Sequence, residues 1–359
     1  MEEVRTLIQA GPDWLELDRL TKHHQVLPQI FRGLRANKDL LSAAVLESYQ
    51  RMDAANTLRN LCLEKELDRI LAVLSQSEVS CVPLKGPRLA LESYGDVALR
   101  VFSDLDIYLH QNNVQLAIKS LINEGYKLTL ELPPSRWESF ERIANQISLT
   151  HRERGWLVEL HWRILNPLYA LDLDAHLSSP KGEALTDEEM LVVLSVHGAK
   201  HIWDKLKWVV DIDRFIKSSD TLDWQATLSL AEAAGCMRMF LLGMQLAESY
   251  CGTKLPALVS DRLSADTALH GLAIRVAEQT FSDLFGCRRF VVEYCYHLTV
   301  RERWSDRLRL SWRWPLWPRS EDWQVYPEGD RFFVVYLVGR LVRVLRKWGV
   351  KASPERAVH

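Results

Sequence analysis

The sequence predicts an α+β fold, in which a small mixed β-sheet is flanked by an N-terminal helical layer and a C-terminal all-helical region. Three observations predict it. Apolar residues recur at helical spacing within residues 12–78, for example Leu40, Leu41, Ala44, Val45 and Tyr49. Residues 79–180 instead hold short apolar runs separated by turn residues, which is typical of strands alternating with short helices. After Asp187 the helical spacing returns.

Composition limits the class of protein. With 359 residues, 47% of them hydrophobic, the chain is long enough for more than one core. We divide it into an N-terminal helical layer (1–78), an α/β core (79–180) and a C-terminal helical domain with a Trp- and Arg-rich tail (181–359). Because 45 basic and 47 acidic residues nearly cancel, no global field attracts nucleic acid, which we do not expect as a partner.

The chain lacks the sequence marks of export. Its first residues, Met-Glu-Glu-Val, are acidic, and its six cysteines are scattered without a Cys-x-x-Cys pair. No run of about eighteen apolar residues occurs, so a membrane-spanning helix is not expected. We therefore expect a cytoplasmic protein with reduced thiols and no stable insertion into a membrane.

The elements follow in order. The first layer, residues 12–78, is expected to cover one face of the sheet. The α/β region predicts a strand at 80–84, a helix at 87–94, a strand at 101–110, a helix at 112–124 closed by Gly125, a strand at 126–130, a helix at 135–144, and strands at 146–151 and 156–161 joined by a hairpin turn at 152–155. The later helices are expected at 188–203, 205–217, 224–234, 237–251 and 265–284.

Two acids stand in the strand predicted at 101–110. Successive side chains of a strand alternate between faces, so Asp104 and Asp106 share one face while Leu105 points the other way. Two carboxylates held together require a positive partner, and a divalent cation such as Mg²⁺ is the usual one. Asp-x-Asp is a weak signal, because it recurs at residues 172–174 and 211–213. The neighbouring segments are what distinguish the first pair.

The upstream neighbour is the turn Lys85-Gly86-Pro87, which fits a phosphate cradle. Glycine permits close backbone approach, proline suits the first turn of a helix, and a helix N-terminus favours anions. An ordinary strand-to-helix turn is the alternative for this segment. Arg100, just before the acidic strand, is expected either to pair with the acids or to reach a phosphate.

The downstream neighbour is the strand holding Glu159 and His161, which share one face. Glu159 is a candidate third acid, and His161 is expected either to contact substrate or to pack beside Trp162. Five short motifs now occur in one order: Leu84-Lys85-Gly86, Arg100 ahead of Asp104-Leu105-Asp106, Val158-Glu159-Leu160-His161-Trp162, His197-Gly198-Ala199-Lys200-His201, and Leu206-Lys207-Trp208 with Asp211.

In combination these motifs, with the segment 323–346, resemble the uncharacterised nucleotidyltransferase family of the polymerase-beta-like nucleotidyltransferase superfamily, over about residues 80–346. The resemblance implies that Asp104, Asp106 and Glu159 are catalytic and hold two divalent metals, Mg²⁺ or Mn²⁺, with Asp106 bridging, Asp104 on the nucleotide side and Glu159 towards the acceptor. Lys85, Gly86 and Arg100 would then bind the co-substrate, a nucleoside triphosphate (NTP).

The implied reaction moves a nucleoside monophosphate from an NTP to a hydroxyl of a small molecule, peptide or protein. The wider superfamily has Gly-Ser at the phosphate turn, whereas this chain has Gly86-Pro87, which removes a hydroxyl and an amide donor. The alternative function is therefore a catalytically inactive nucleotidyltransferase-like module that binds a protein partner.

Three further features receive expectations. His197 and His201 stand at i, i+4 on a helix, but the glutamate of a His-Glu-x-x-His zinc motif is missing, so we expect an orienting or structural role rather than zinc. Asp211 and Asp213 are expected to face solvent or to pair with Lys207 and Lys217. The Trp- and Arg-rich tail is expected to pack irregularly, and residues 332–348 to form a helix docked on the protein rather than on a membrane.

Overall fold

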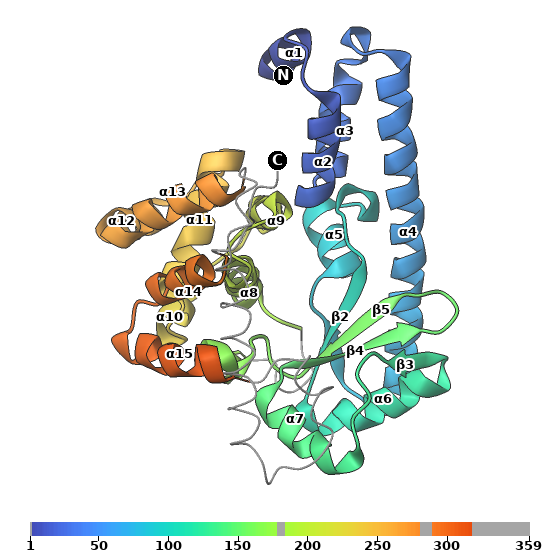
Figure 1. Cartoon of the computed structure of the whole chain (residues 1–359), viewed down its shortest axis with the longest axis vertical. Coiled ribbons are helices and arrows are strands. Elements are labelled where there is room, and N and C mark those ends of the chain that lie inside the picture. Colours follow the sequence, from blue (N-terminus) through green and yellow to red (C-terminus); the bar gives the residue numbers. More distant parts are fainter. Residues whose placement is uncertain (1, 178–183, 281–288, 318–359) are drawn as a thin grey trace, which may run out of the picture.

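The computed structural model describes residues 2–177, 184–280 and 289–317. The expected docked helix at 332–348 and the last part of the family resemblance, 323–346, lie outside the described residues. Figure 1 shows a sheet with a long helix along one side and a group of later helices on the other. The predicted α+β class is confirmed.

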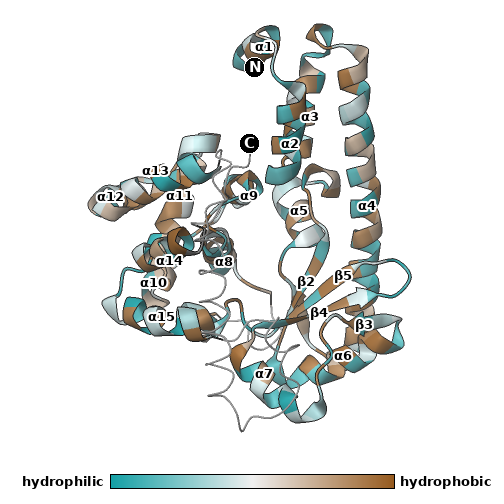
Figure 2. Cartoon of the chain, in the orientation of Figure 1, coloured by the Kyte–Doolittle hydropathy of each residue, from teal (hydrophilic) through white to brown (hydrophobic). Residues whose placement is uncertain are grey.

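The sheet has five strands in the order β1 (Cys81–Pro83), β2 (Asp104–Leu109), β5 (Leu157–His161), β4 (Gln146–His151) and β3 (Tyr126–Leu128). Strands β2 and β5 run parallel, and the other neighbouring pairs are antiparallel. The predicted mixed sheet is therefore confirmed, and all five predicted strands exist with small differences at their ends. β4 alternates between polar and hydrophobic residues, and Figure 2 shows that the loop joining it to β5 is hydrophilic, as expected of a hairpin turn.

Three short helices complete this layer: α5 (Gly86–Tyr94), α6 (Val114–Asn123) and α7 (Trp137–Ile143). Gly125, just past the end of α6, has φ +89°, so it occupies the left-handed position in which glycine commonly ends a helix. Leu105, Ile107 and Leu109 of β2 are almost fully buried, in one core with residues from α4 and α6. The opposite face of β2 is left to the polar residues discussed below.

The N-terminal layer consists of α1 (Glu2–Gln9), α2 (Trp14–His24), α3 (Leu27–Ala36) and α4 (Ala43–Gln76). The expectation that this layer covers the sheet is right only for the second half of α4, whose Leu63 and Ile70 lie in the core of the sheet. Phe31 and Tyr49 belong to a separate small cluster with α1. A helix of 34 residues is about 50 Å long, so α4 extends well beyond the strands (Figure 1).

The C-terminal region is helical, as predicted, and packs around α8 (Asp187–Lys200), which is buried along most of its length. A capping box of Thr186 and Glu189 starts this helix. The remaining helices are α9 (Leu206–Ser218), α10 (Trp224–Ala233), α11 (Met237–Cys251), α12 (Ala257–Ala265), α13 (Thr267–Thr280), α14 (Arg289–Thr299) and α15 (Trp304–Leu316).

The expectation of an irregular tail is wrong for residues 304–316, which form α15 with Trp314 buried against Tyr169 and His297. Aromatic packing of this kind stabilises a helix even when a proline stands in its last turn. Within the described ranges, no helix combines the length and the apolar character that crossing a membrane requires.

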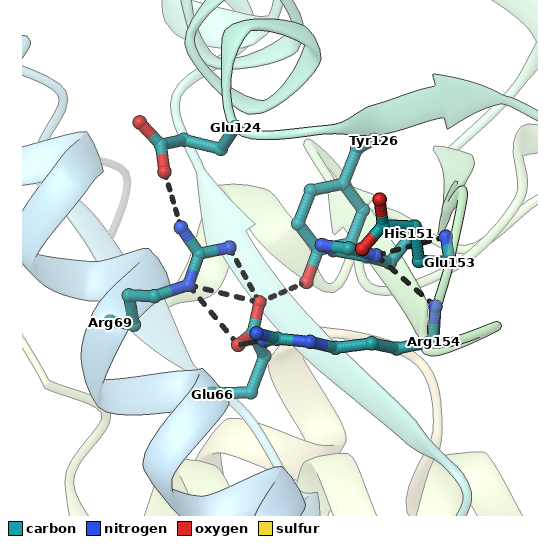
Figure 3. Close-up of polar contacts among 7 residues, drawn as sticks. All are labelled: Glu66, Arg69, Glu124, Tyr126, His151, Glu153 and Arg154. Atoms are coloured by element: carbon teal, nitrogen blue, oxygen red, sulfur yellow. Dashed lines mark hydrogen bonds and ion pairs between the residues drawn. The ribbon is translucent and has the colours of Figure 1, made fainter.

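A polar cluster ties α4 to the far edge of the sheet (Figure 3). Glu66 of α4, only 3% exposed, accepts hydrogen bonds from Arg69 at 2.6 Å, from the hydroxyl of Tyr126 at 2.6 Å and from Arg154 at 3.2 Å. Arg69 also pairs with Glu124 of the loop after α6. Burial alone would raise the pKa of Glu66, but the hydrogen bonds of Arg69 and Tyr126 lower it. The charged carboxylate therefore stabilises the folded state.

We expect Glu66→Gln to lower the free energy of unfolding by about 1–3 kcal/mol at neutral pH. The amide keeps one acceptor but loses the charge, while Arg69 and Arg154 stay partly exposed and so do not become buried unpaired cations. Urea denaturation of both proteins measures the difference. The difference in the free energy of unfolding should vanish as the pH falls through the lowered pKa of Glu66, because the wild-type carboxylate is then protonated and loses the same charge. Glu47→Gln, at an exposed position of α4, is the control and should change little.

Candidate active site

The register of β2 and β5 brings the predicted acids together. Asp106 stands directly opposite Glu159 in this parallel pair, on the same face of the sheet. His161, two residues further along β5, places Nε2 at 2.8 Å from Oδ1 of Asp106 and 3.6 Å from Oε2 of Glu159. One potential ligand atom from each of these three residues lies within 4.8 Å of the others. The sequence predicted that Glu159 and His161 share a face, but it did not predict that His161 contacts both acids.

Asp104 lies on the same face of β2 but is not one of these three. Its carboxylate lines the same cavity, and it makes no hydrogen bond or ion pair with any residue the structure describes. Burial and the neighbouring charge of Asp106 raise the pKa of Asp104. Asp106 behaves oppositely: burial would raise its pKa, but Lys85 and His161 hold it well below the usual range. Asp106 is therefore held in its ionised form, whereas burial and the charge of Asp106 disfavour the ionised form of Asp104.

The predicted phosphate turn lies directly beside the acids. Lys85, at the start of α5, places Nζ at 3.3 Å from Oδ2 of Asp106 and 3.2 Å from Nδ1 of His197. Gly86 has φ +59°, and a Cβ there would approach the carbonyl oxygen of Asp104 to 3.3 Å. Glycine is therefore needed for the turn to pack this closely on β2. In this structure the charge of Lys85 is directed at Asp106.

Arg100 pairs with Asp211 of α9, and the expectation that it pairs with the acids of β2 is wrong. Its Nε and Nη2 donate to the two carboxylate oxygens of Asp211 at 2.7 and 2.9 Å, and the hydroxyl of Tyr94 donates to the same carboxylate at 2.6 Å. The guanidinium also borders the cavity, so a contact with phosphate stays a prediction.

The expectation that Asp211 faces solvent or pairs with Lys207 is wrong, because Asp211 is 1% exposed and bound to Arg100. The side of α9 that carries it packs on α5, which turns the carboxylate inward. Asp213 does pair with Lys217, at 2.6 Å, but it is also buried and accepts a hydrogen bond from Thr253.

These residues surround a cavity of about 330 Å³ between the sheet and helices α8 and α9. That size suits a small-molecule ligand. Asp104, Asp106 and Glu159 form the wall on the sheet side. The wall on the helical side carries the basic and aromatic side chains Lys200, Lys205, Lys207, His197, His201 and Trp208.

His197 of α8 and His201, the residue that follows the end of α8, pack on each other and on Trp208. The ring of His201 is stacked on that of Trp208 at 5.0 Å, and the rings of His197 and His201 lie 4.8 Å apart. Burial, followed by the charge of Lys85, holds the pKa of His197 well below its usual value. A neutral His197 accepts a hydrogen bond from the ammonium of Lys85. Its Nδ1 is therefore occupied by a lysine and is not directed at the carboxylates.

The donor set suits a divalent cation. Carboxylate oxygens are the preferred ligands of Mg²⁺, and one imidazole nitrogen is compatible with Mn²⁺ as well. Asp106 and Glu159 supply the carboxylates and His161 the imidazole, with Asp104 beside them in the same cavity. Two or three negative charges placed this closely are costly unless a cation neutralises them.

The lysines of the helical wall are the main residues that sequence reasoning did not place in the site. Lys200 was noted only as a member of a motif and Lys205 only as the start of a helix, while Lys207 was expected only as a possible partner of Asp211. Their spacing along the chain contains no pattern that predicts a shared cavity. They meet because α8 and α9 are joined by a short turn and both face β2.

The comparisons with known proteins give one result. A family model described as "Uncharacterised nucleotidyltransferase" matches residues 10–252. Searches of curated proteins and of solved structures each found no match. The match begins earlier than the resemblance seen in the motifs and includes most of the N-terminal layer, and it ends with α11. Because it spans well over half of the 359 residues, the chain belongs to this uncharacterised nucleotidyltransferase family.

Proposed function

We propose that this protein is a divalent-metal-dependent nucleotidyltransferase, which moves a nucleoside monophosphate from an NTP to a hydroxyl of a small molecule, peptide or protein. One observation carries the proposal. Asp106 and Glu159 stand opposite each other in a parallel strand pair, with Asp104 on the same face, at the wall of a cavity large enough for a ligand. Membership of the family supports the reaction class.

In this proposal Asp104, Asp106 and Glu159 would hold the divalent cation. When bound, the cation, Mg²⁺ or Mn²⁺, would lower the pKa of the acceptor hydroxyl and neutralise charge on the phosphates. The acceptor oxygen bonds to the α-phosphorus while the bond to the bridging oxygen of pyrophosphate breaks, and the hydroxyl proton passes to water. The protein contributes positioning and electrostatic stabilisation rather than covalent chemistry.

His161 has a positioning role in this scheme. Its Nε2 contacts both Asp106 and Glu159, so the imidazole fixes the orientation of the two carboxylates across the strand pair. Such contacts hold ligands in the geometry that a metal requires. Lys85, at 3.3 Å from Asp106, neutralises that carboxylate before a cation binds.

The second candidate function is a catalytically inactive module that binds a protein partner. The observation that favours it is the ion pair of Lys85 with Asp106. The ammonium group that was expected to bind phosphate is engaged by a carboxylate instead. The Gly86-Pro87 sequence, which lacks a hydroxyl donor, agrees with it. The two candidates differ in whether an NTP binds together with a metal.

Thermal unfolding tests the proposal directly. We expect the NTP that the protein uses to raise the melting temperature only when Mg²⁺ or Mn²⁺ is present, because the cation joins the phosphates to the carboxylates. A ligand at a hundred times its Kd adds about 2.7 kcal/mol to the free energy of unfolding. Mass spectrometry of candidate acceptors incubated with the protein, Mg²⁺ and each NTP should then show the mass of one nucleoside monophosphate. Equal stabilisation in excess chelator argues against a metal-bridged site, and no stabilisation by any NTP favours the inactive module.

We also propose a cytoplasmic location. The five cysteines within the described ranges, Cys62, Cys81, Cys236, Cys251 and Cys295, are all free thiols. Unpaired cysteines are typical of a reducing compartment.

A further inference from the structure

Three lysines of the helical wall form no ion pair with any residue that the structure describes. Lys200 ends α8, Lys205 precedes α9 and Lys207 lies in the first turn of α9, and all three line the cavity that holds the acids. The ammonium of Lys205 lies over the ring of Trp208, 5.9 Å from its centroid. By contrast, the other two strong bases of the cavity, Lys85 and Arg100, are already paired with Asp106 and Asp211.

The turn that carries these lysines is held in an unusual backbone conformation. Ile202 and Trp203 both lie in the left-handed region, with φ of 58° and 57°. Such conformations cost free energy in residues other than glycine and persist only where the surroundings enforce them. Here the enforcing contact is the ring of Trp203, which is fully buried against Gly198 and Gly243, where a Cβ would collide with it. The turn is therefore fixed, and so are the positions of the lysines on either side.

The start of α9 adds to the positive character of this wall. Lys205 occupies the N-cap position without a side-chain cap hydrogen bond, and the first turn of the helix contains no acidic residue. The first amide N–H groups of an α-helix lack partners within the helix and favour anions. In this 13-residue helix the amide of Trp208 already donates to the carbonyl of Lys205, which leaves the amides of Leu206 and Lys207 as further donors at the end of the cavity that holds the lysines.

The burial of these unpaired charges destabilises the folded protein. Burial, followed by the charge of Lys85, lowers the pKa of Lys200 to about 8, and burial, followed by the charge of Arg100, does the same for Lys207. Both lysines remain mainly protonated at pH 7. Bound anions would offset this cost. The three ammonium groups and the helix end together match a ligand of several negative charges better than one with a single charge.

We propose that the side chains of Lys200, Lys205 and Lys207, with the backbone amides of Leu206 and Lys207, bind the β- and γ-phosphates of the NTP, the part that leaves as pyrophosphate. This inference rests on the proposed function and moves the main phosphate contacts away from the Lys85-Gly86 turn predicted from the sequence. In the structure Lys85 is engaged by Asp106 and His197. The lysines that form no ion pair with a described residue are Lys200, Lys205 and Lys207 on the helical wall.

Equilibrium binding of three probes tests the inference: Mg²⁺-bound NTP, the corresponding nucleoside monophosphate, and inorganic tripolyphosphate. For Lys200→Met and Lys207→Met we expect the Kd for NTP and tripolyphosphate to rise at least tenfold, while the Kd for the monophosphate changes less than threefold. Lys207→Arg should restore most of the loss. Lys119→Met, at an exposed position of α6, is the matched control and should bind all probes like wild type.

The metal-free variants should melt at or above the wild-type temperature, because each removes an unpaired half-buried charge. A structural lysine would instead lower the melting temperature. If wild type binds Mg²⁺-NTP and the lysine variants bind it equally well, this inference is wrong and the proposed function stands. If the variants slow transfer while their NTP affinity is unchanged, the lysines serve the acceptor and the inference is again wrong. If wild type binds neither NTP nor tripolyphosphate, both proposals are wrong.

Discussion

Asp104→Asn is expected to reduce Mg²⁺-dependent transfer by roughly a thousandfold or more, on the order of 4 kcal/mol of lost transition-state stabilisation. A neutral amide is a poor substitute for an anionic oxygen ligand of a hard cation. The same change should also remove the stabilisation by Mg²⁺ and NTP that wild type shows. Transfer is measured as the mass increment of the acceptor, and binding as the shift in melting temperature.

The metal-free Asp104→Asn protein should be as stable as wild type, or more stable by up to ~1 kcal/mol. Asp104 makes no hydrogen bond with a described residue, and burial and Asp106 already raise its pKa. The amide therefore relieves repulsion and breaks no contact. Loss of transfer together with retained stability in Asp104→Asn would identify Asp104 as a metal ligand rather than a structural residue.

Asp172→Asn is the matched control, because Asp172 belongs to another Asp-x-Asp pair and is exposed. It should leave transfer within a few-fold of wild type. Full transfer by Asp104→Asn, or unfolding of that variant alone, would show that the carboxylates of β2 are structural.

Asp211→Asn is expected to destabilise the protein by about 3–5 kcal/mol. The change leaves the guanidinium of Arg100, only 4% exposed, without its charged partner, and weakens the hydrogen bond of Tyr94. This pair joins the segment before β2 to α9, across the end of the cavity. Urea denaturation followed by circular dichroism measures the loss. A change below 1 kcal/mol would contradict a buried, desolvated pair.

The double variant Arg100→Met with Asp211→Leu completes the test. Replacing both partners by apolar residues removes the unpaired charge, so the double variant should recover much of the stability lost in Asp211→Asn. NTP affinity of the folded double variant then decides the second role expected of Arg100. Wild-type affinity would limit Arg100 to positioning α9, whereas a tenfold loss would add a phosphate contact.

The fold could be predicted where local patterns are strong. Short apolar runs bounded by turn residues identified all five strands, and the spacing of apolar residues identified the main helices. The two-residue repeat of a strand placed Asp104 with Asp106, and Glu159 with His161, on common faces. These conclusions need only the geometry of one strand, since a carboxylate two residues away in a strand always lies on the same side.

The sequence failed where a position depends on what packs against it. Asp211 was expected to face solvent or to pair with Lys207, but its side of α9 packs on α5 and its carboxylate meets Arg100, 111 residues earlier in the chain. The N-terminal layer was expected to cover the sheet, but α4 is too long for the strands it meets. In both cases the partner surface, rather than the local pattern, set the burial.

By itself, then, the sequence determined the α+β class, the strands and the acids that share each face, because these follow from the repeat of the backbone. Only the tertiary structure decided that β2 lies parallel to β5 with Asp106 opposite Glu159, a pairing of residues 53 apart in the chain. It alone brought Lys200, Lys205 and Lys207 to the wall facing those acids. Strand register and helix packing are set by the burial of distant apolar surfaces against one another, which no short stretch of residues contains.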